Sequence, residues 1–64
     1  MFHIRFAGRV FEIKPKVFEL SLQASDGEIL SKTADWLGVP ETRLDDYVIE
    51  RVPGTTVIVR PRVR

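Results

Sequence analysis

The sequence predicts a single α+β domain, spanning residues 1–64, in which two β-hairpins flank one amphipathic helix. Apolar and polar residues alternate near both ends of the chain, which is the period of half-buried strands. Between these segments, apolar residues follow helical spacing behind a capping signal. A length of 64 residues leaves no room for a second domain.

The first hairpin is predicted from residues 2–6 and 9–13, where apolar and polar residues alternate on both sides of a turn. Ala7-Gly8-Arg9 supplies the turn, since glycine adopts a positive φ without steric cost. The alternating apolar residues are Phe2, Ile4, Phe6, Phe11 and Ile13.

Residues 17–23 leave two alternatives open. Lys14-Pro15-Lys16 interrupts the second strand, because proline cannot donate a hydrogen bond to a ladder. Phe18, Leu20 and Leu22 then alternate with Val17, Glu19 and Ser21. The segment either continues the second strand beyond a kink or forms a short, separate edge strand.

The helix is predicted at 26–37. Ser25 and Glu28 have the spacing of a capping box, and Gly38 followed by Pro40 marks the end. The apolar stripe comprises Ile29, Leu30, Thr33, Ala34, Trp36 and Leu37. We expect Trp36 to pack in the core beside Ile29 and Leu37, because such a stripe faces the core of a small domain. The alternative is that Trp36 binds a partner at the edge of the helix.

The second hairpin is predicted from strands at 47–52 and 56–60, joined by Pro53-Gly54-Thr55. The polar connector before it, Glu41 to Asp46, has room for one helical turn. Two hairpins and one helix fit together most simply when the first and last strands pair in parallel, with a right-handed crossover. This ββαββ arrangement, with one helix on a four-stranded mixed sheet, is the β-grasp topology.

Composition excludes the usual covalent and metal supports of a small domain. The chain has no cysteine, and a single histidine cannot build a tetrahedral zinc site. Small scaffolds without such supports often rely on association, so we expect a protein partner or a homo-oligomer. The chain has no asparagine, one glutamine and one methionine, a composition typical of thermophilic proteins.

Localisation is predicted from features that the sequence lacks. No basic, then apolar, then small-residue segment opens the chain, and no apolar run approaches the roughly 18 residues of a membrane span. We therefore expect a cytoplasmic protein without a membrane partner.

Catalysis is not indicated. His3 lies on a strand without a nucleophile–base partner, and we interpret it as a surface histidine. Asp45 and Asp46 are adjacent carboxylates, which we interpret as solvated connector residues rather than cation ligands. The glycines form no phosphate-binding loop. We expect a non-enzyme without cofactor, catalytic residue or metal.

The candidate binding residues lie near the end of the chain. Arg60, Arg62 and Arg64 alternate without a nearby acid in the sequence, and Arg5 joins them if the first strand is their neighbour. Such a row binds phosphates or an acidic protein, or else it protects a sheet edge from aggregation. The net charge of +1 argues against a general polyanion binder.

Ile58 is the apolar candidate of the same strand. If Val57 and Val59 face the helix, Ile58 faces away from it, on the open side of the sheet. Flanked by arginines on a central strand, it is predicted to seed a protein-binding patch.

Part of the chain resembles a known family. Leu44-Asp45-Asp46-Tyr47-Val48-Ile49, followed by 56–62, resembles the closing segment of ubiquitin, with its Leu-x-Asp-Tyr-x-Ile turn, apolar strand and arginine-bearing tail. Gly38-Val39-Pro40 is similar to the Gly-Ile-Pro that follows ubiquitin's helix. The resemblance, which covers about a third of the chain, implies the ubiquitin-like β-grasp superfamily.

The resemblance implies protein binding through the open face of the sheet, where Ile58 matches one apolar residue of ubiquitin's recognition patch. It also places Tyr47 in a turn, whereas the alternation places it at the start of a strand. The chain is shorter than ubiquitin and ends Arg62-Val63-Arg64 instead of with the diglycine that conjugation requires. The leading hypothesis is thus a non-catalytic protein-interaction module, and the alternative is a small nucleic-acid-associated protein.

Overall fold

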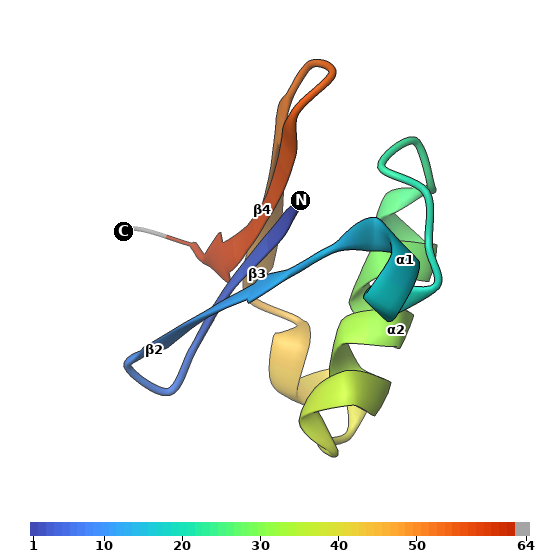
Figure 1. The fold of residues 1–64 in the computed structure, drawn as a ribbon. Helices are drawn as coiled ribbons and strands as arrows, with labels where there is room; N and C mark the ends of the chain where they lie inside the picture. The colour runs from blue at the N-terminus through green and yellow to red at the C-terminus, as the bar shows by residue number, and fades with distance from the viewer. Residues whose placement is uncertain (63–64) are drawn as a thin grey trace.

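A computed structural model describes residues 1–62 of the chain. Its elements are, in chain order, β1 (Phe2–Phe6), β2 (Arg9–Ile13), α1 (Pro15–Phe18), α2 (Asp26–Leu37), the 3₁₀ helix η1 (Glu41–Leu44), β3 (Tyr47–Val52) and β4 (Thr56–Pro61). The strands form one sheet in the order β2-β1-β4-β3, in which β1 and β4 are parallel and the other pairs are antiparallel. Figure 1 shows the helices together on one side of this sheet.

This architecture confirms an α+β domain with one main helix on a four-stranded mixed sheet, and it is compatible with the expected ββαββ topology. Both strands of the first hairpin and the main helix have the expected bounds. The last strand extends one residue further than expected, to Pro61.

The parallel pairing of β1 with β4 forms the centre of the sheet. Phe2 lies opposite Val57 and Ile4 opposite Val59, and the Val57 N–H donates to the Met1 carbonyl at 3.0 Å. Alternate residues of β4 therefore turn their backbone groups toward β1, and the next in this series is Pro61. Proline has no N–H to donate, which is a physical reason for the pairing to end there.

The main helix α2 has both termini that its sequence predicts. The Ser25 hydroxyl accepts a hydrogen bond from the Glu28 N–H at 3.2 Å, and the Glu28 carboxylate accepts one from the Ser25 N–H at 3.3 Å. At the other end Gly38 has a left-handed φ of 72°, which lets Val39 N–H reach back to the Ala34 carbonyl at 3.0 Å.

Both alternatives for residues 17–23 are wrong. Pro15 begins the one-turn helix α1, where its fixed φ fits the first helical position, and Glu19 ends it with a left-handed φ of 57°. The chain after Glu19 belongs to turns and loop, not to a strand. The alternating apolar residues arise because a helical turn and the following loop both direct side chains to the core.

Phe18 is the anchor of this segment. It is 1% exposed, and its ring centroid lies 4.8 Å from that of Phe2 on the central strand β1. Val17, beside it in α1, is 65% exposed. One turn of helix thus drives one large side chain into the core and leaves its neighbour in solvent.

The core lies between α2, α1 and the helix-facing side of the sheet. Its buried members are Phe2, Ile4, Ile13, Phe18, Ile29, Val57 and Val59. Thr33 is buried among them, and its hydroxyl donates to the Ile29 carbonyl at 2.6 Å, which satisfies it within the helix.

The expected core position of Trp36 is wrong. Its side chain is 45% exposed and packs edge-on against Phe11 of β2, with ring centroids 5.1 Å apart. Ile29, Thr33 and Ala34 form the buried centre of the helix stripe, so Trp36 lies on its flank. Trp36 therefore covers the outer part of β2 rather than the core.

The placement of α1 predicts opposite outcomes for two neighbouring substitutions. Phe18→Ala should lower the free energy of unfolding by about 3–5 kcal/mol, because it empties a fully buried site. Val17→Ala should change it by less than about 0.5 kcal/mol, because that side chain is in solvent. Urea unfolding followed by circular dichroism measures both. Equal losses for the two variants would contradict the assignment of α1.

Candidate interaction surface

The side of the sheet that faces away from the helices is the candidate interaction surface, termed here the open face. Val57 and Val59 of β4 are buried under the helices, so the residues that alternate with them point the other way. The strand registers then assign the same orientation on the neighbouring strands. The open face is formed mainly by His3, Arg5, Val10, Glu12, Val48, Glu50, Ile58 and Arg60.

Ile58 lies in the middle of this face, on the side opposite the core, as its alternation predicts. It sits between His3 of β1 and Glu50 of β3, directly opposite both in the registers. These neighbours leave it half-buried rather than fully exposed. An apolar residue is thus framed by polar side chains at the centre of the sheet.

Arg60 has an acidic partner in space, although no acid lies near it in the sequence. Its guanidinium bonds the Glu50 carboxylate through both Nε, at 2.5 Å, and Nη2. The antiparallel register brings Glu50 of β3 beside Arg60, although ten residues separate the two in the sequence. Both donors converge on one carboxylate oxygen, Oε1, and the two charge-assisted bonds hold both side chains in one geometry.

The other predicted arginines are placed differently. Arg5 is exposed on β1, next to β4 and on the open face, as predicted for a neighbouring strand. Its side chain makes no ion pair or hydrogen bond within residues 1–62. Arg62 is exposed, and its backbone N–H donates to the Asp46 carbonyl at 2.8 Å. Arg64 lies outside the described residues.

The charges of the open face are mixed in sign. His3 lies 3.8 Å from Glu12, and Arg60 pairs with Glu50, so acidic side chains lie among the basic ones on this face. A groove that follows a nucleic-acid backbone is instead lined by one sign of charge. A face of mixed charge therefore complements the surface of a protein partner better than it complements a polyanion.

The described residues contain no cluster that could hold a metal. Within 1–62, no group of three or more histidine, aspartate or glutamate side chains comes together. Asp45 and Asp46 are exposed in the turn between η1 and β3. In the same part of the chain, none of the helices is both long and apolar enough to pass through a bilayer.

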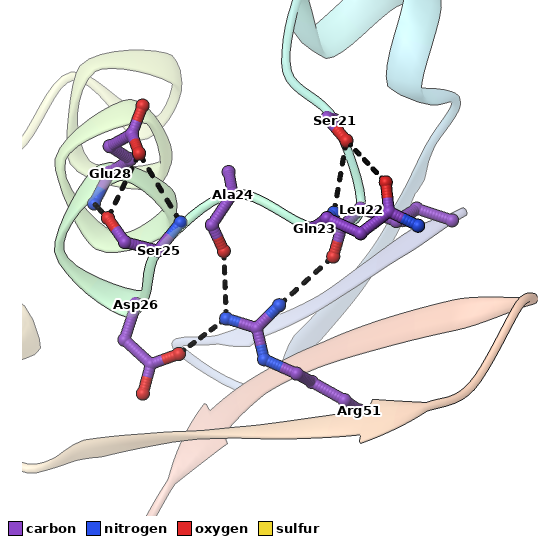
Figure 2. Close-up of polar contacts among 8 residues, drawn as sticks. All are labelled: Ser21, Leu22, Gln23, Ala24, Ser25, Asp26, Glu28 and Arg51. Carbon is purple, nitrogen blue, oxygen red and sulfur yellow. Dashed lines mark hydrogen bonds and ion pairs between the residues drawn. The ribbon is translucent and has the colours of Figure 1, made fainter.

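Arg51 is a structural residue that the sequence reasoning missed. Figure 2 shows its guanidinium spread against the segment that leads into α2. It donates to the carbonyls of Leu22 at 3.0 Å and Ala24 at 2.9 Å, and it contacts the Asp26 carboxylate at 2.5 Å. These contacts are termed the Arg51 clamp.

The parity of β3 was the available signal for this clamp. Tyr47, Ile49 and Arg51 share the side of the strand that faces the helices, so an arginine in that series has to find polar partners there. The clamp borders an open hollow of about 410 Å³, which Leu22, Val52 and Val57 help to line. It ties the second hairpin to the loop before α2.

Aromatic contacts hold the other end of β3. The ring centroids of Tyr47 and Phe6 lie 6.1 Å apart, and the Arg43 guanidinium lies 5.6 Å from the Phe6 ring centroid. Burial raises the pKa of the Tyr47 hydroxyl above its usual value, and the positive charge of Arg43 opposes this shift. Tyr47 begins β3, so the turn position that the ubiquitin resemblance gives it is wrong.

Comparisons of the chain with protein-family models, with curated proteins and with solved structures found no match.

The Arg51 clamp predicts a local effect that a solvated arginine would not have. Arg51→Met keeps much of the side-chain volume but leaves the Leu22 and Ala24 carbonyls without this donor. We expect a loss of about 1–3 kcal/mol in unfolding free energy, with faster amide exchange concentrated in residues 21–26. Lys16→Met, at an exposed position of α1, is the control and should change neither. Unchanged exchange in 21–26 would contradict the clamp.

Proposed function

We propose that this chain is a non-catalytic protein-interaction module of the ubiquitin-like β-grasp type, which binds a protein partner or a second copy through the open face and the edges of its sheet. The observation that carries the proposal is the open face itself. Ile58 lies at its centre, flanked by the His3–Glu12 contact on one side and the Arg60–Glu50 ion pair on the other.

The energetic logic follows from that arrangement. A half-buried isoleucine contributes favourable binding free energy when a partner removes its remaining surface from water. Solvated charges at the rim mainly affect the association rate and the orientation of the partner. Because Glu50 and Arg60 already neutralise each other, a partner does not have to supply a counter-charge to either. An apolar centre with a polar rim is the usual anatomy of a protein interface.

The strand order and the one main helix support a β-grasp, as does the glycine that ends α2. The ubiquitin-like part of the proposal rests on the match of Ile58 to ubiquitin's recognition patch and on Gly38-Val39-Pro40. It does not use Tyr47, which begins a strand.

Nucleic-acid binding is the second candidate. The observation in its favour is that Arg5 has no side-chain partner within residues 1–62 and that Arg62 is exposed beyond the end of β4. Both can contact phosphates. The acids on the open face count against a continuous phosphate-binding stripe.

Ile58→Lys tests the role of the open face. Lysine is preferred to aspartate here because Glu50 lies directly opposite and would repel a second carboxylate. A photo-crosslinking residue at Glu12, at the rim of the open face, should yield discrete protein adducts in extract of the source cells. Ile58→Lys in the same protein should abolish them, because a desolvated apolar anchor carries affinity.

Two controls make the outcome decisive. The crosslinking residue at exposed Ser31 of α2 should give no adduct that depends on Ile58. Random-sequence DNA should bind the unmodified protein only weakly. Tight, salt-sensitive DNA binding that Arg5→Ala weakens and Ile58→Lys does not weaken would instead establish the nucleic-acid candidate.

A further inference from the structure

The outer edge of β3 offers backbone groups whose directions follow from the structure. Arg62 N–H donates to the Asp46 carbonyl, so positions 46, 48, 50 and 52 turn their backbone groups toward β4. Tyr47, Ile49 and Arg51 consequently turn their N–H and C=O groups outward. Within residues 1–62 no strand pairs with this edge.

The charged side chains of β3 are bonded to other groups of the same chain, so they do not give this edge the usual protection against strand pairing. Free charged side chains on an edge strand discourage another strand from approaching. Glu50 is instead bound to Arg60 of the adjacent strand, and Arg51 is held by Asp26 and two carbonyls. The strand contains no proline and ends with exposed Val52.

The opposite edge, β2, is better protected. It is one residue shorter, and its outward backbone groups are those of Val10 and Glu12 only. Arg9 is exposed and makes no side-chain ion pair within the described part of the chain. Lys14 and Pro15 follow directly, and proline blocks further pairing. Strand addition is therefore favoured at β3.

We propose that two copies of this chain pair through β3, antiparallel about a two-fold axis at Ile49. This register is the one that joins the outward groups most fully, since Ile49 meets Ile49 of the second copy and Tyr47 meets Arg51. Each such pair exchanges two N–H···O bonds. A centre at Glu50 is less favourable, because it joins only the Ile49–Arg51 pairs and places Glu50 directly opposite Glu50 of the second copy.

A second copy suits this edge because the same register also brings compatible side chains together. On the open face Val48 of each copy lies opposite Glu50 of the other, so no like charges lie directly opposite each other. The two Glu50 side chains are diagonal neighbours, and each is bound to Arg60 of its own copy. The helices of both copies lie on the same side of a continuous eight-stranded sheet, and both open faces remain available. The inference deepens the proposed function by assigning the edge to self-association and leaving the open face for a different partner.

Chemical synthesis of this short chain permits a test at a single backbone atom. N-methylation of Ile49 removes one outward donor and leaves the bonds between β3 and β4 intact. We expect sedimentation equilibrium to show a dimer for the unmodified chain and a dissociation constant about tenfold or more higher for the N-methyl chain. N-methylation of Val10, the outward residue of β2, is the matched control and should leave the dimer unchanged.

Charge substitutions at Val48 test the register independently. Val48→Glu places like charges opposite each other twice in the dimer and should raise the dissociation constant roughly 2- to 30-fold. Within one copy it lies opposite Arg60, an oppositely charged neighbour, and circular dichroism of the variant checks that the loss of dimer is not a loss of fold. Val48→Lys reverses both signs and should preserve or tighten the dimer.

The outcomes separate this inference from the proposed function. Ile58→Lys should lose its crosslinked partner yet dimerise like the unmodified chain. A monomer at all concentrations up to about 1 mM would overturn the β3 dimer and leave the open-face proposal standing. A dimer broken by Val10 methylation, or weakened by Val48→Lys and not by Val48→Glu, would also overturn it.

Discussion

The parallel pairing of β1 with β4 is the constraint on which the rest of the structure depends. It joins the two ends of the chain, as the Val57 N–H bonds the Met1 carbonyl and the terminal ammonium bonds the Thr55 carbonyl at 2.7 Å. Closing so long a loop costs chain entropy that local contacts do not offset. Burial of apolar surface in the core offsets this cost, because Phe2, Ile4 and their partners on β4 are fully buried under α2.

This pairing also determines where function can reside. With β1 and β4 in the centre, Ile58 comes to the middle of the open face, and β2 and β3 become the two edges. The side of the sheet that faces the helices is covered by the core and by the Arg51 clamp. A domain of this size without cysteine has a small core, and the association proposed at the open face and at β3 would bury surface that the single copy leaves exposed.

Most of the fold could be predicted from the sequence, because its signals are local. Alternation, the Ser25–Glu28 capping box and Gly38 identify the strands and α2 directly. Residues 17–23 could not be assigned, because one helical turn followed by a loop mimics a strand period. At the site, the orientation of Ile58 followed from parity alone. The partners of Arg51 and Arg60 depend on the strand register and on tertiary packing, which no local pattern reveals.

The most direct test of the account is the set of nuclear Overhauser contacts between the first and last strands in solution. The account predicts backbone contacts between His3 and Ile58, together with the slowest amide exchange at Val57 and Val59. The same contacts must appear in the N-methyl-Ile49 monomer, because they lie within one chain. Their absence, with β1 found instead beside β3, would contradict the central pairing and every surface assigned from it.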